Sequence, residues 1–262
     1  MKLGTESSLE NYYCSPGRED RSGAQIHDML FAKAYCIENN YKYIGCPMWR
    51  GAEKLVEYLN ITNNYKKIDH SKYKILSPSI YRKKDSTIFT QKIRDKIISN
   101  FNYKFDNIFT ITVHIRRGDI SPEPNNKYAN RYLYNKYYIN ILNKILIHLE
   151  KYNNNNKNII INICSESKSF ESFDEFKKIT DCNVKLHLDT SLNKVFDLMI
   201  HSDILILSKS SISFVPAFYN KRCVIYYPFW HKKLDHWLTS TEIDFDVQLE
   251  EQIKNLIVKY HS

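Results

Sequence analysis

The most informative stretch of this sequence reads Ile108-Phe109-Thr110-Ile111-Thr112-Val113-His114-Ile115-Arg116-Arg117-Gly118-Asp119. Its apolar part is short, rich in β-branched residues and apolar on both faces, which predicts a buried strand of a parallel sheet over 108–114. Polar groups at the carboxyl end of such a strand lie where open α/β sheets bind ligands. Most of the 38 basic residues are lysines. The two adjacent arginines therefore indicate a specific site for phosphate or carboxylate, since guanidiniums bind these groups through two parallel hydrogen bonds.

The pattern His114-x-Arg116-Arg117-x-Asp119 resembles the signature of fucosyltransferases that use GDP-fucose, the α1,2, α1,6 and protein O-fucosyltransferases. The resemblance implies that Arg116, Arg117 and Asp119 belong to a catalytic site. Two simpler interpretations compete with it. Arg117-Gly118-Asp119 is also the adhesion tripeptide, which requires an exposed loop tip in a secreted protein. Asp119 is also consistent with a structural Arg–Asp pair that closes a turn.

Composition narrows the class of protein. With 262 residues and 43% hydrophobic content, the chain can bury the core of one large domain or two small ones. A net charge of +9 indicates an anionic partner, such as nucleic acid, a membrane surface or a nucleotide sugar. The lysines are scattered, so no nucleic-acid partner is expected. Six cysteines without a CxxC predict reduced thiols. No apolar leader or run of about 18 apolar residues appears, so we expect a cytoplasmic chain without a membrane span.

The amino-terminal part predicts a small α/β domain over 1–105, with a boundary near Asn100–Asn107. Residues 1–20 are polar and end in Ser15-Pro16-Gly17-Arg18-Glu19-Asp20, which predicts a loop. The elements expected after it are helix 24–38, strand 41–46, helix 51–59, a possible edge strand 73–76 and helix 90–99.

The carboxyl-terminal part, 106–262, alternates apolar runs with helical periodicity, which predicts a doubly wound parallel sheet. The expected strands are 108–114, 158–164, 183–188, 203–207 and 224–227. The expected helices are 131–152, 170–179, 192–201, one that carries Phe214, Ala217 and Phe218, and a last one with Asp246 as its N-cap. The fucosyltransferase resemblance implies a GT-B-like arrangement, in which two Rossmann-like halves face each other and the ligand lies in the cleft.

A second motif follows the strand over 203–207. Ser208-Lys209-Ser210-Ser211-Ile212-Ser213 opens a helix, so that hydroxyls, a lysine and free backbone N–H groups converge on one point. The whole run 192–213 resembles the closing motif of the same superfamily. That resemblance implies that Ser210, Ser211 and Ser213 bind phosphate oxygens of the donor. A run of serines is also a common helix cap, which is the simpler alternative.

The resemblance also implies roles for other residues in donor binding. Arg116 would bind the β-phosphate and support the departing GDP, and His114 would contact the nucleoside or order the arginine. Asp197 is our choice for the acid that recognises guanine, with Asp189 as the alternative. Arg117 follows Arg116 on an extended segment, so its side chain should point away and stabilise Asp119 or the neighbouring loop.

The amino-terminal helix begins with Gly23-Ala24-Gln25, which resembles the glycine-rich loop of these enzymes and implies that Gly23, Ala24 and Gln25 contact the donor. A plain helix start explains the same residues. Four titratable residues near this loop are candidates for a general base that activates the acceptor hydroxyl, unless the transition state is dissociative and needs none: Glu19, Asp20, His27 and Asp28.

No metal or other cofactor is expected. Asp244-Phe245-Asp246 spells a DxD, which binds a divalent ion in another glycosyltransferase fold, but Asp246 is the expected helix cap. His231 and His236 are five residues apart, a spacing that a helix does not place on one face.

The sequence thus predicts an inverting, metal-independent glycosyltransferase that moves fucose from GDP-fucose to a glycan or protein hydroxyl. Two alternatives remain open, an enzyme of the same fold that uses another nucleotide sugar and a non-catalytic glycan- or nucleotide-binding module. Nothing in the sequence indicates an oligomeric state.

Overall fold

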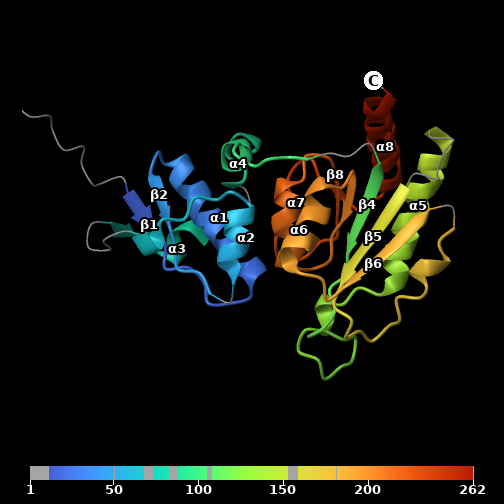
Figure 1. Ribbon diagram of the computed structural model, residues 1–262, viewed down its shortest axis with the longest axis horizontal. Coiled ribbons are helices and arrows are strands. Elements are labelled where there is room, and N and C mark those ends of the chain that lie inside the picture. The colour runs from blue at the N-terminus through green and yellow to red at the C-terminus, as the bar shows by residue number, and fades with distance from the viewer. Residues whose placement is uncertain are drawn as a thin grey trace, which may run out of the picture. The chain divides into compact units, whose positions relative to one another are not determined.

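The computed structural model describes residues 12–49, 51–67, 73–82, 88–104, 108–152, 159–180 and 182–261, with side chains as far as Val258. The chain divides into two compact units, Met1–Asn102 and Tyr103–Ser262. Each unit is built around a parallel sheet (Figure 1), which confirms the predicted α/β class with two parallel sheets. Within the described part, no helix combines the length and apolar character that crossing a membrane requires.

The first unit contains a three-stranded parallel sheet with the order β2-β1-β3. Helix α1 packs against α2, α3 and α4 as well as against β2, so it is the centre of this unit. The elements in chain order are β1 (Tyr12–Cys14), α1 (Ser22–Glu38), β2 (Lys42–Gly45), α2 (Ala52–Tyr58), a 3-10 turn (Tyr65–Lys67), β3 (Lys74–Ile75), α3 (Pro78–Tyr81) and α4 (Gln91–Ile98).

The loop prediction for residues 1–20 is wrong at Tyr12–Cys14, which form the central strand of this sheet. Three residues are too few to show an alternating pattern, and polar sequence surrounds them. The strand forms because it pairs with a neighbouring strand on each edge and because Cys14 is buried. Residues 1–11 lie outside the described part of the chain.

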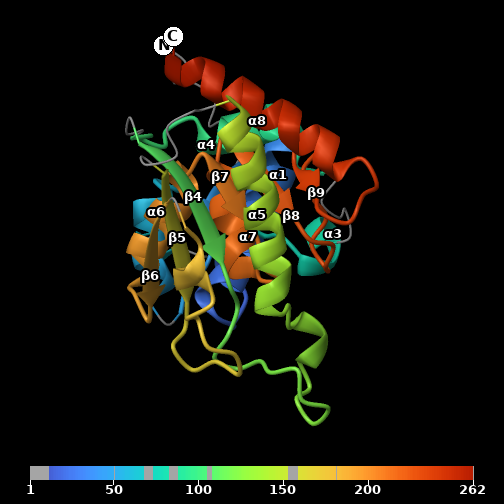
Figure 2. The same cartoon turned by 90° about the vertical axis from the view of Figure 1, so that its right-hand side faces the viewer.

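The second unit contains a six-stranded parallel sheet with the order β6-β5-β4-β7-β8-β9. Helices α5 and α8 pack together on one face and α6 and α7 on the other; Figure 2 looks onto α5 and α8. The elements are β4 (Phe109–His114), a 3-10 turn (Ala129–Arg131), α5 (Asn135–Tyr152), β5 (Ile159–Ser165), a second 3-10 turn (Phe176–Lys178), β6 (Asn183–Leu188), α6 (Leu192–His201), β7 (Ile204–Ile206), α7 (Ser211–Tyr219), β8 (Cys223–Tyr226), β9 (Leu238–Thr239) and α8 (Phe245–His261).

One hydrophobic core cluster of this unit lies between the sheet and the α5–α8 pair. Strand β4 contributes Ile111 and Val113, both fully buried, and the neighbouring β5 contributes Ile161 and Ile163 in register with them. Both faces of these central strands are covered by helices, which is why their sequences are almost continuously apolar. The rigid sheet holds the ends of β4 and β7 in fixed positions relative to each other.

Three predicted elements of the second unit differ from the structure. The prediction of a helix over 170–179 is wrong, because the described residues there form only a 3-10 turn. The Ser172 hydroxyl accepts the backbone N–H of Asp174 at 3.1 Å, and such local bonds compete with a helix. Helix α5 begins at Asn135, four residues later than predicted, after a separate 3-10 turn. Asp246 is not an N-cap; it lies inside α8 and accepts a hydrogen bond from Lys144 at 2.8 Å.

Candidate functional site

The order of the strands defines where a ligand can bind in the second unit. From β4 the chain moves outward through β5 and β6, and then returns to the other side of β4 and moves outward through β7, β8 and β9. In open α/β sheets the ligand crevice lies outside the carboxyl ends of the strands at which this direction reverses. The reversal here falls between β4 and β7, and these are the two strands that are followed by the sequence motifs.

His114 and Ser208 join the two strand ends directly. His114 is the last residue of β4, and its Nδ1 lies 2.6 Å from the Ser208 hydroxyl, which comes just after β7. Burial, with smaller contributions from Arg116 and Arg117, lowers the pKa of His114 to about 3. The imidazole is therefore neutral near pH 7, so it contributes a hydrogen bond at this point and no positive charge.

Arg116 follows β4 and is held by Asp119. Its Nη2 lies 3.1 and 3.3 Å from the two carboxylate oxygens of Asp119, and 13% of its side chain is exposed. Gly118, with a φ of +79°, makes the turn that brings Asp119 back to the arginine. The buried Nε of Arg116 has no hydrogen-bond acceptor among the described residues. The Arg116 guanidinium is thus oriented by one carboxylate and retains hydrogen-bonding capacity.

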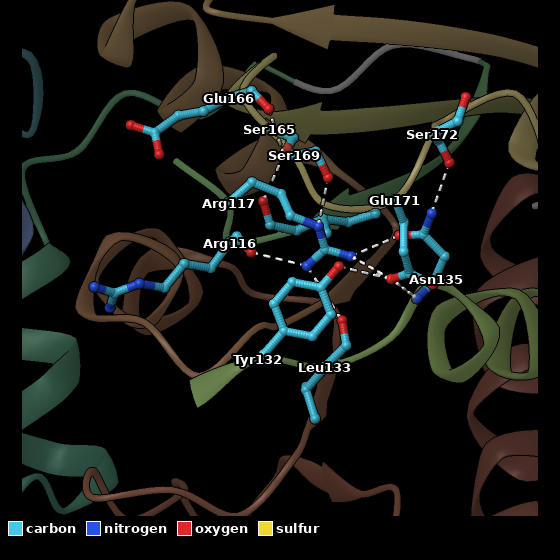
Figure 3. A network of polar contacts seen from close by, with 11 residues as sticks. Arg116, Arg117, Tyr132, Leu133, Asn135, Ser165, Glu166, Ser169, Glu171 and Ser172 are labelled. Atoms are coloured by element: carbon cyan, nitrogen blue, oxygen red, sulfur yellow. Dashed lines mark hydrogen bonds and ion pairs between the residues drawn. The ribbon is translucent and has the colours of Figure 1, made fainter. Parts of the chain in front are cut away.

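Arg117 has a different environment, although it is the next residue. Its guanidinium is fully buried and leads away from that of Arg116 into a polar network (Figure 3). All five of its N–H groups have acceptors: Ser169 Oγ at 3.0 Å, the carbonyls of Arg116 at 2.9 Å and Leu133 at 3.2 Å, Asn135 Oδ1 at 2.6 Å and Glu171 Oε2 at 3.2 Å. Arg117 therefore stabilises the neighbouring loop, and Asp119 pairs with Arg116 instead.

The three predicted phosphate-binding serines have unlike surroundings. The Ser210 side chain is the N-cap of α7 and accepts the N–H of Ile212. The Ser213 hydroxyl is buried and donates to the carbonyls of Ser208 and Ser210. Ser211 is the first residue of α7, is partly exposed, and has its hydroxyl 2.8 Å from Nε2 of His231. Of the three hydroxyls, that of Ser211 lies nearest to solvent.

Several contacts around the α7 N-terminus were not predicted from the sequence. Trp230 Nε1 donates to His231 Nε2 at 3.1 Å, and the Arg131 guanidinium lies 4.5 Å from the Trp230 ring. Lys209 donates to the carbonyl of Asn130 at 2.8 Å. The segments that follow β4, β7 and β8 are therefore connected at this edge. Trp230 and His231 follow a predicted strand in the same way as the two motifs do, and that signal could have identified them.

The two candidates for guanine recognition lie on different elements: Asp189 directly follows strand β6, and Asp197 lies inside helix α6. Asp189 follows β6 at the carboxyl edge, has a φ of +52°, and accepts the Ser167 N–H at 3.0 Å. Hydrogen bonds from the side chain and the backbone of Ser167 lower the pKa of Asp189. Asp197 lies in the middle of α6, where its carboxylate is 3.1 Å from His201 Nδ1. Asp189 shares the edge of the sheet with the β4 and β7 ends, and Asp197 lies further along α6.

The predicted donor-binding residues of the first unit belong to the start of α1. Gly23 and Ala24 lie in its first turn. The Gln25 amide donates to the carbonyls of Asp20 at 2.6 Å and Trp49 at 3.0 Å, and its oxygen accepts the Trp49 N–H at 2.8 Å. The side chain of Gln25 thus holds the loops after β1 and β2 together.

Three of the four candidate bases in the first unit already contact other side chains of the protein. The Asp28 carboxylate is buried and accepts from Tyr81 at 2.8 Å and Arg82 at 2.5 Å. The ring of His27 packs edge-on against Phe31, 4.7 Å between centroids. Glu19 is exposed, and Asp20 pairs with Arg18.

The DxD residues Asp244 and Asp246 have protein partners. Gln248 donates to the Asp244 carboxylate, and Lys144 donates to Asp246. Among the described residues, no group of three or more histidine, cysteine or acidic side chains is arranged to hold a metal ion.

No family model and no curated protein matches the sequence. Solved structures with similar folds include POFUT1 in complex with GDP, at 10% identity over 83% of this chain and 96% of that chain, with a TM-score of 0.39. Another is the bacterial iron-containing dodecameric glycosyltransferase TibC from enterotoxigenic E. coli, at 11% identity over 95% and 75%, with a TM-score of 0.39. POFUT1 in complex with GDP-fucose is similar at 12% identity over 80% and 70%, with a TM-score of 0.31. Similarity at this level carries no inference about the substrate of this chain.

Proposed function

We propose that this protein is a glycosyltransferase that transfers fucose from GDP-fucose to a hydroxyl of a glycan or a protein. The observation that carries the proposal is the placement of Arg116 and of the α7 N-terminus after the two strands, β4 and β7, that flank the reversal of the sheet. A diphosphate is bound by a guanidinium fork together with free backbone N–H groups at a helix start. The choice of guanosine as the nucleoside and of fucose as the sugar rests on the sequence resemblance to fucosyltransferases.

Arg116 is proposed to stabilise the departing GDP. As the bond to the sugar breaks, negative charge concentrates on the β-phosphate, and a guanidinium at that position interacts more strongly in the transition state than in the ground state. Asp119 orients the guanidinium through Nη2, while Nε has no acceptor among the described residues. That arrangement suits an arginine that is held in position before its ligand arrives.

His114 is proposed to order the site. Its depressed pKa keeps the ring neutral, and its bond to Ser208 connects the end of β4 to the turn that precedes α7. The arginine and the helix N-terminus would then be held at a fixed separation. Because the buried ring is bonded to Ser208, we assign His114 to ordering the site, and contact with the nucleoside stays the alternative.

The remaining donor contacts are assigned by their position at the same edge. Ser211, with His231 against its hydroxyl, and the backbone N–H groups that begin α7 would bind phosphate oxygens. Asp189 is favoured over Asp197 for guanine, because it lies at the carboxyl end of β6. We also propose that no divalent ion is required, since cationic side chains and a helix N-terminus can neutralise the leaving diphosphate.

Release of GDP from GDP-fucose tests the proposal, measured for the wild type with and without a mixture of glycan and peptide acceptors. Arg116→Ala and Arg116→Lys should each lower turnover about 10²- to 10³-fold, since one ammonium cannot replace the two-pronged guanidinium. Lys151→Ala, which removes an exposed ion pair with Glu250 in the last turn of α5, is the control and should leave turnover unchanged.

Two results would replace the proposal with one of its alternatives. Turnover of a uridine or adenosine diphosphate sugar in place of GDP-fucose would indicate the same chemistry with another donor. Nucleotide binding without any release of GDP, even with acceptors present, would indicate a non-catalytic binding module.

A further inference from the structure

Glu171 gathers three donors on a single oxygen. Its Oε2 accepts hydrogen bonds from Tyr132 Oη at 2.8 Å, the backbone N–H of Asn135 at 2.9 Å and Arg117 Nη2 at 3.2 Å (Figure 3). Glu171 belongs to the connection between β5 and β6, whereas two of the donors belong to the connection between β4 and α5 and the third is the first residue of α5. One carboxylate thus joins the two loops that leave the neighbouring strands β4 and β5.

The same contacts fix the start of α5. Asn135 is the first residue of this helix, so its N–H lacks an acceptor within the helix and obtains one from Glu171. The Asn135 side chain reinforces the connection, since it donates to the carbonyl of Ser172 at 2.8 Å and accepts from Arg117 at 2.6 Å. The negative charge of Glu171 also lies near the positive end of the helix dipole, which stabilises both.

Charge makes Glu171 hard to replace. The Arg117 guanidinium is fully buried, and a buried cation is tolerated only with a counter-charge and complete hydrogen bonding. Glu171 supplies the counter-charge, and 23% of its own side chain is exposed. The Tyr132 ring covers the guanidinium at 4.2 Å. Burial, together with the hydrogen bond to Glu171, raises the pKa of Tyr132, so the phenol remains a donor to this carboxylate.

The network reaches Arg116 through the main chain. Arg117 Nη1 donates to the carbonyl of Arg116 at 2.9 Å and to that of Leu133 at 3.2 Å. Holding the Arg116 carbonyl fixes the peptide plane that follows it, and with it the direction in which the Arg116 side chain leaves the backbone. Figure 3 shows the Arg116 side chain directed away from the network that holds its carbonyl.

We propose that Glu171 is a positioning residue for Arg116. It neutralises and orients Arg117, which in turn holds the Arg116 carbonyl and so directs the Arg116 guanidinium. The proposal deepens the function proposed above and rests on it where turnover is concerned. The placement of Arg116 by Glu171 is a property of the folded chain and can be measured without any substrate.

The structural test uses the side-chain N–H signals of arginine in ¹⁵N NMR spectra. Glu171→Gln keeps the size of the side chain and removes its charge. Glu175→Gln makes the same change at an exposed position of the same connection and is the control. We expect Glu171→Gln to shift or broaden the Nε–H signals of both Arg117 and Arg116, and Glu175→Gln to leave both unchanged. A changed Arg117 signal with an unchanged Arg116 signal would overturn the proposal.

The kinetic test is a double-mutant cycle. Glu171→Gln should lower kcat for GDP-fucose at least tenfold in the wild-type background and have no further effect when Arg116 is already alanine, because both substitutions remove the same function. Multiplicative losses would show that Glu171 acts independently of Arg116. If Glu171→Gln does not fold, Tyr132→Phe removes one donor to Glu171 and should produce the same pattern with a smaller loss. If the wild type does not use GDP-fucose, the proposed function fails, and the NMR result still decides the positioning role.

Discussion

Replacing each of the two adjacent arginines by alanine should affect different properties: Arg117→Ala should lower the stability of the fold, and Arg116→Ala should lower turnover. Arg117→Ala removes a fully buried guanidinium together with five hydrogen bonds, and it leaves the Glu171 carboxylate without its cation. Arg116→Ala removes an arginine whose partner, Asp119, is 29% exposed. The two substitutions delete the same atoms at neighbouring positions, so each serves as the control for the other.

The magnitudes follow from burial. Removing one partner of a buried ion pair costs about 3–5 kcal/mol. The 23% exposure of Glu171 allows water to reach the abandoned carboxylate, so we expect about 3 kcal/mol for Arg117→Ala. In a unit of this size that is a fall in Tm of roughly 6–12 °C. The Arg116–Asp119 pair is partly exposed and local, and its loss should cost at most about 1 kcal/mol.

Urea denaturation and calorimetry of both variants, with GDP release measured alongside, test this difference. Arg117→Ala should unfold at clearly lower urea concentration, whereas Arg116→Ala should unfold close to the wild type and lose turnover. The reasoning would be refuted if Arg116→Ala proved the more destabilising of the two, or if Arg117→Ala melted within about 2 °C of the wild type, a change of less than 1 kcal/mol.

Three further outcomes are expected. The folded-state pKa of His114, about 3, lies below its unfolded value near 6.5, so the unfolded chain binds an extra proton between these pH values. The free energy of unfolding should therefore fall by about 1.4 kcal/mol per pH unit as the pH decreases through that window. A His114→Gln variant, measured by urea titration from pH 6.5 to 5, should lose this part of the slope, and an unchanged slope would contradict a buried neutral ring. Gln25→Ala should cost about 2 kcal/mol in urea unfolding, because it leaves Trp49 main-chain groups unpaired, whereas weaker GDP binding at unchanged stability would instead support a donor contact. Turnover should persist in excess chelator, and loss of activity that manganese restores would revive Asp244 and Asp246 as metal ligands.

Local sequence signals predicted most elements of the fold. Strand β4 and helix α6 were predicted almost to the residue, because a continuous apolar run and a 3.6-residue period are properties of the local sequence. Strand β1 was missed because its three residues depend on partners that lie far along the chain. The connection over 170–179 was misassigned because the buried Phe173 and Phe176 are three residues apart, a spacing that helices and 3-10 turns share.

The candidate site was predictable in its position and less so in its contacts. Both motifs were expected at carboxyl strand ends, and the sheet places β4 next to β7. Long-range partners could not be read from the sequence. Glu171 lies 54 residues from Arg117, and His231 lies 20 residues from Ser211. No local pattern specifies which acid neutralises a buried arginine, because that choice depends on how the loops fold over the sheet.

Calorimetric titration with GDP and with guanosine, on the wild type and on Arg116→Lys, tests the central claim most directly. If Arg116 and the α7 N-terminus bind a diphosphate, GDP should bind far more tightly than guanosine. Loss of one charge-assisted contact of about 1.5–3 kcal/mol should then weaken GDP binding by Arg116→Lys roughly 10- to 100-fold, with guanosine unaffected. Equal affinities for GDP and guanosine, or unchanged GDP binding by Arg116→Lys, would contradict the claim that this edge of the sheet is a nucleotide-sugar site.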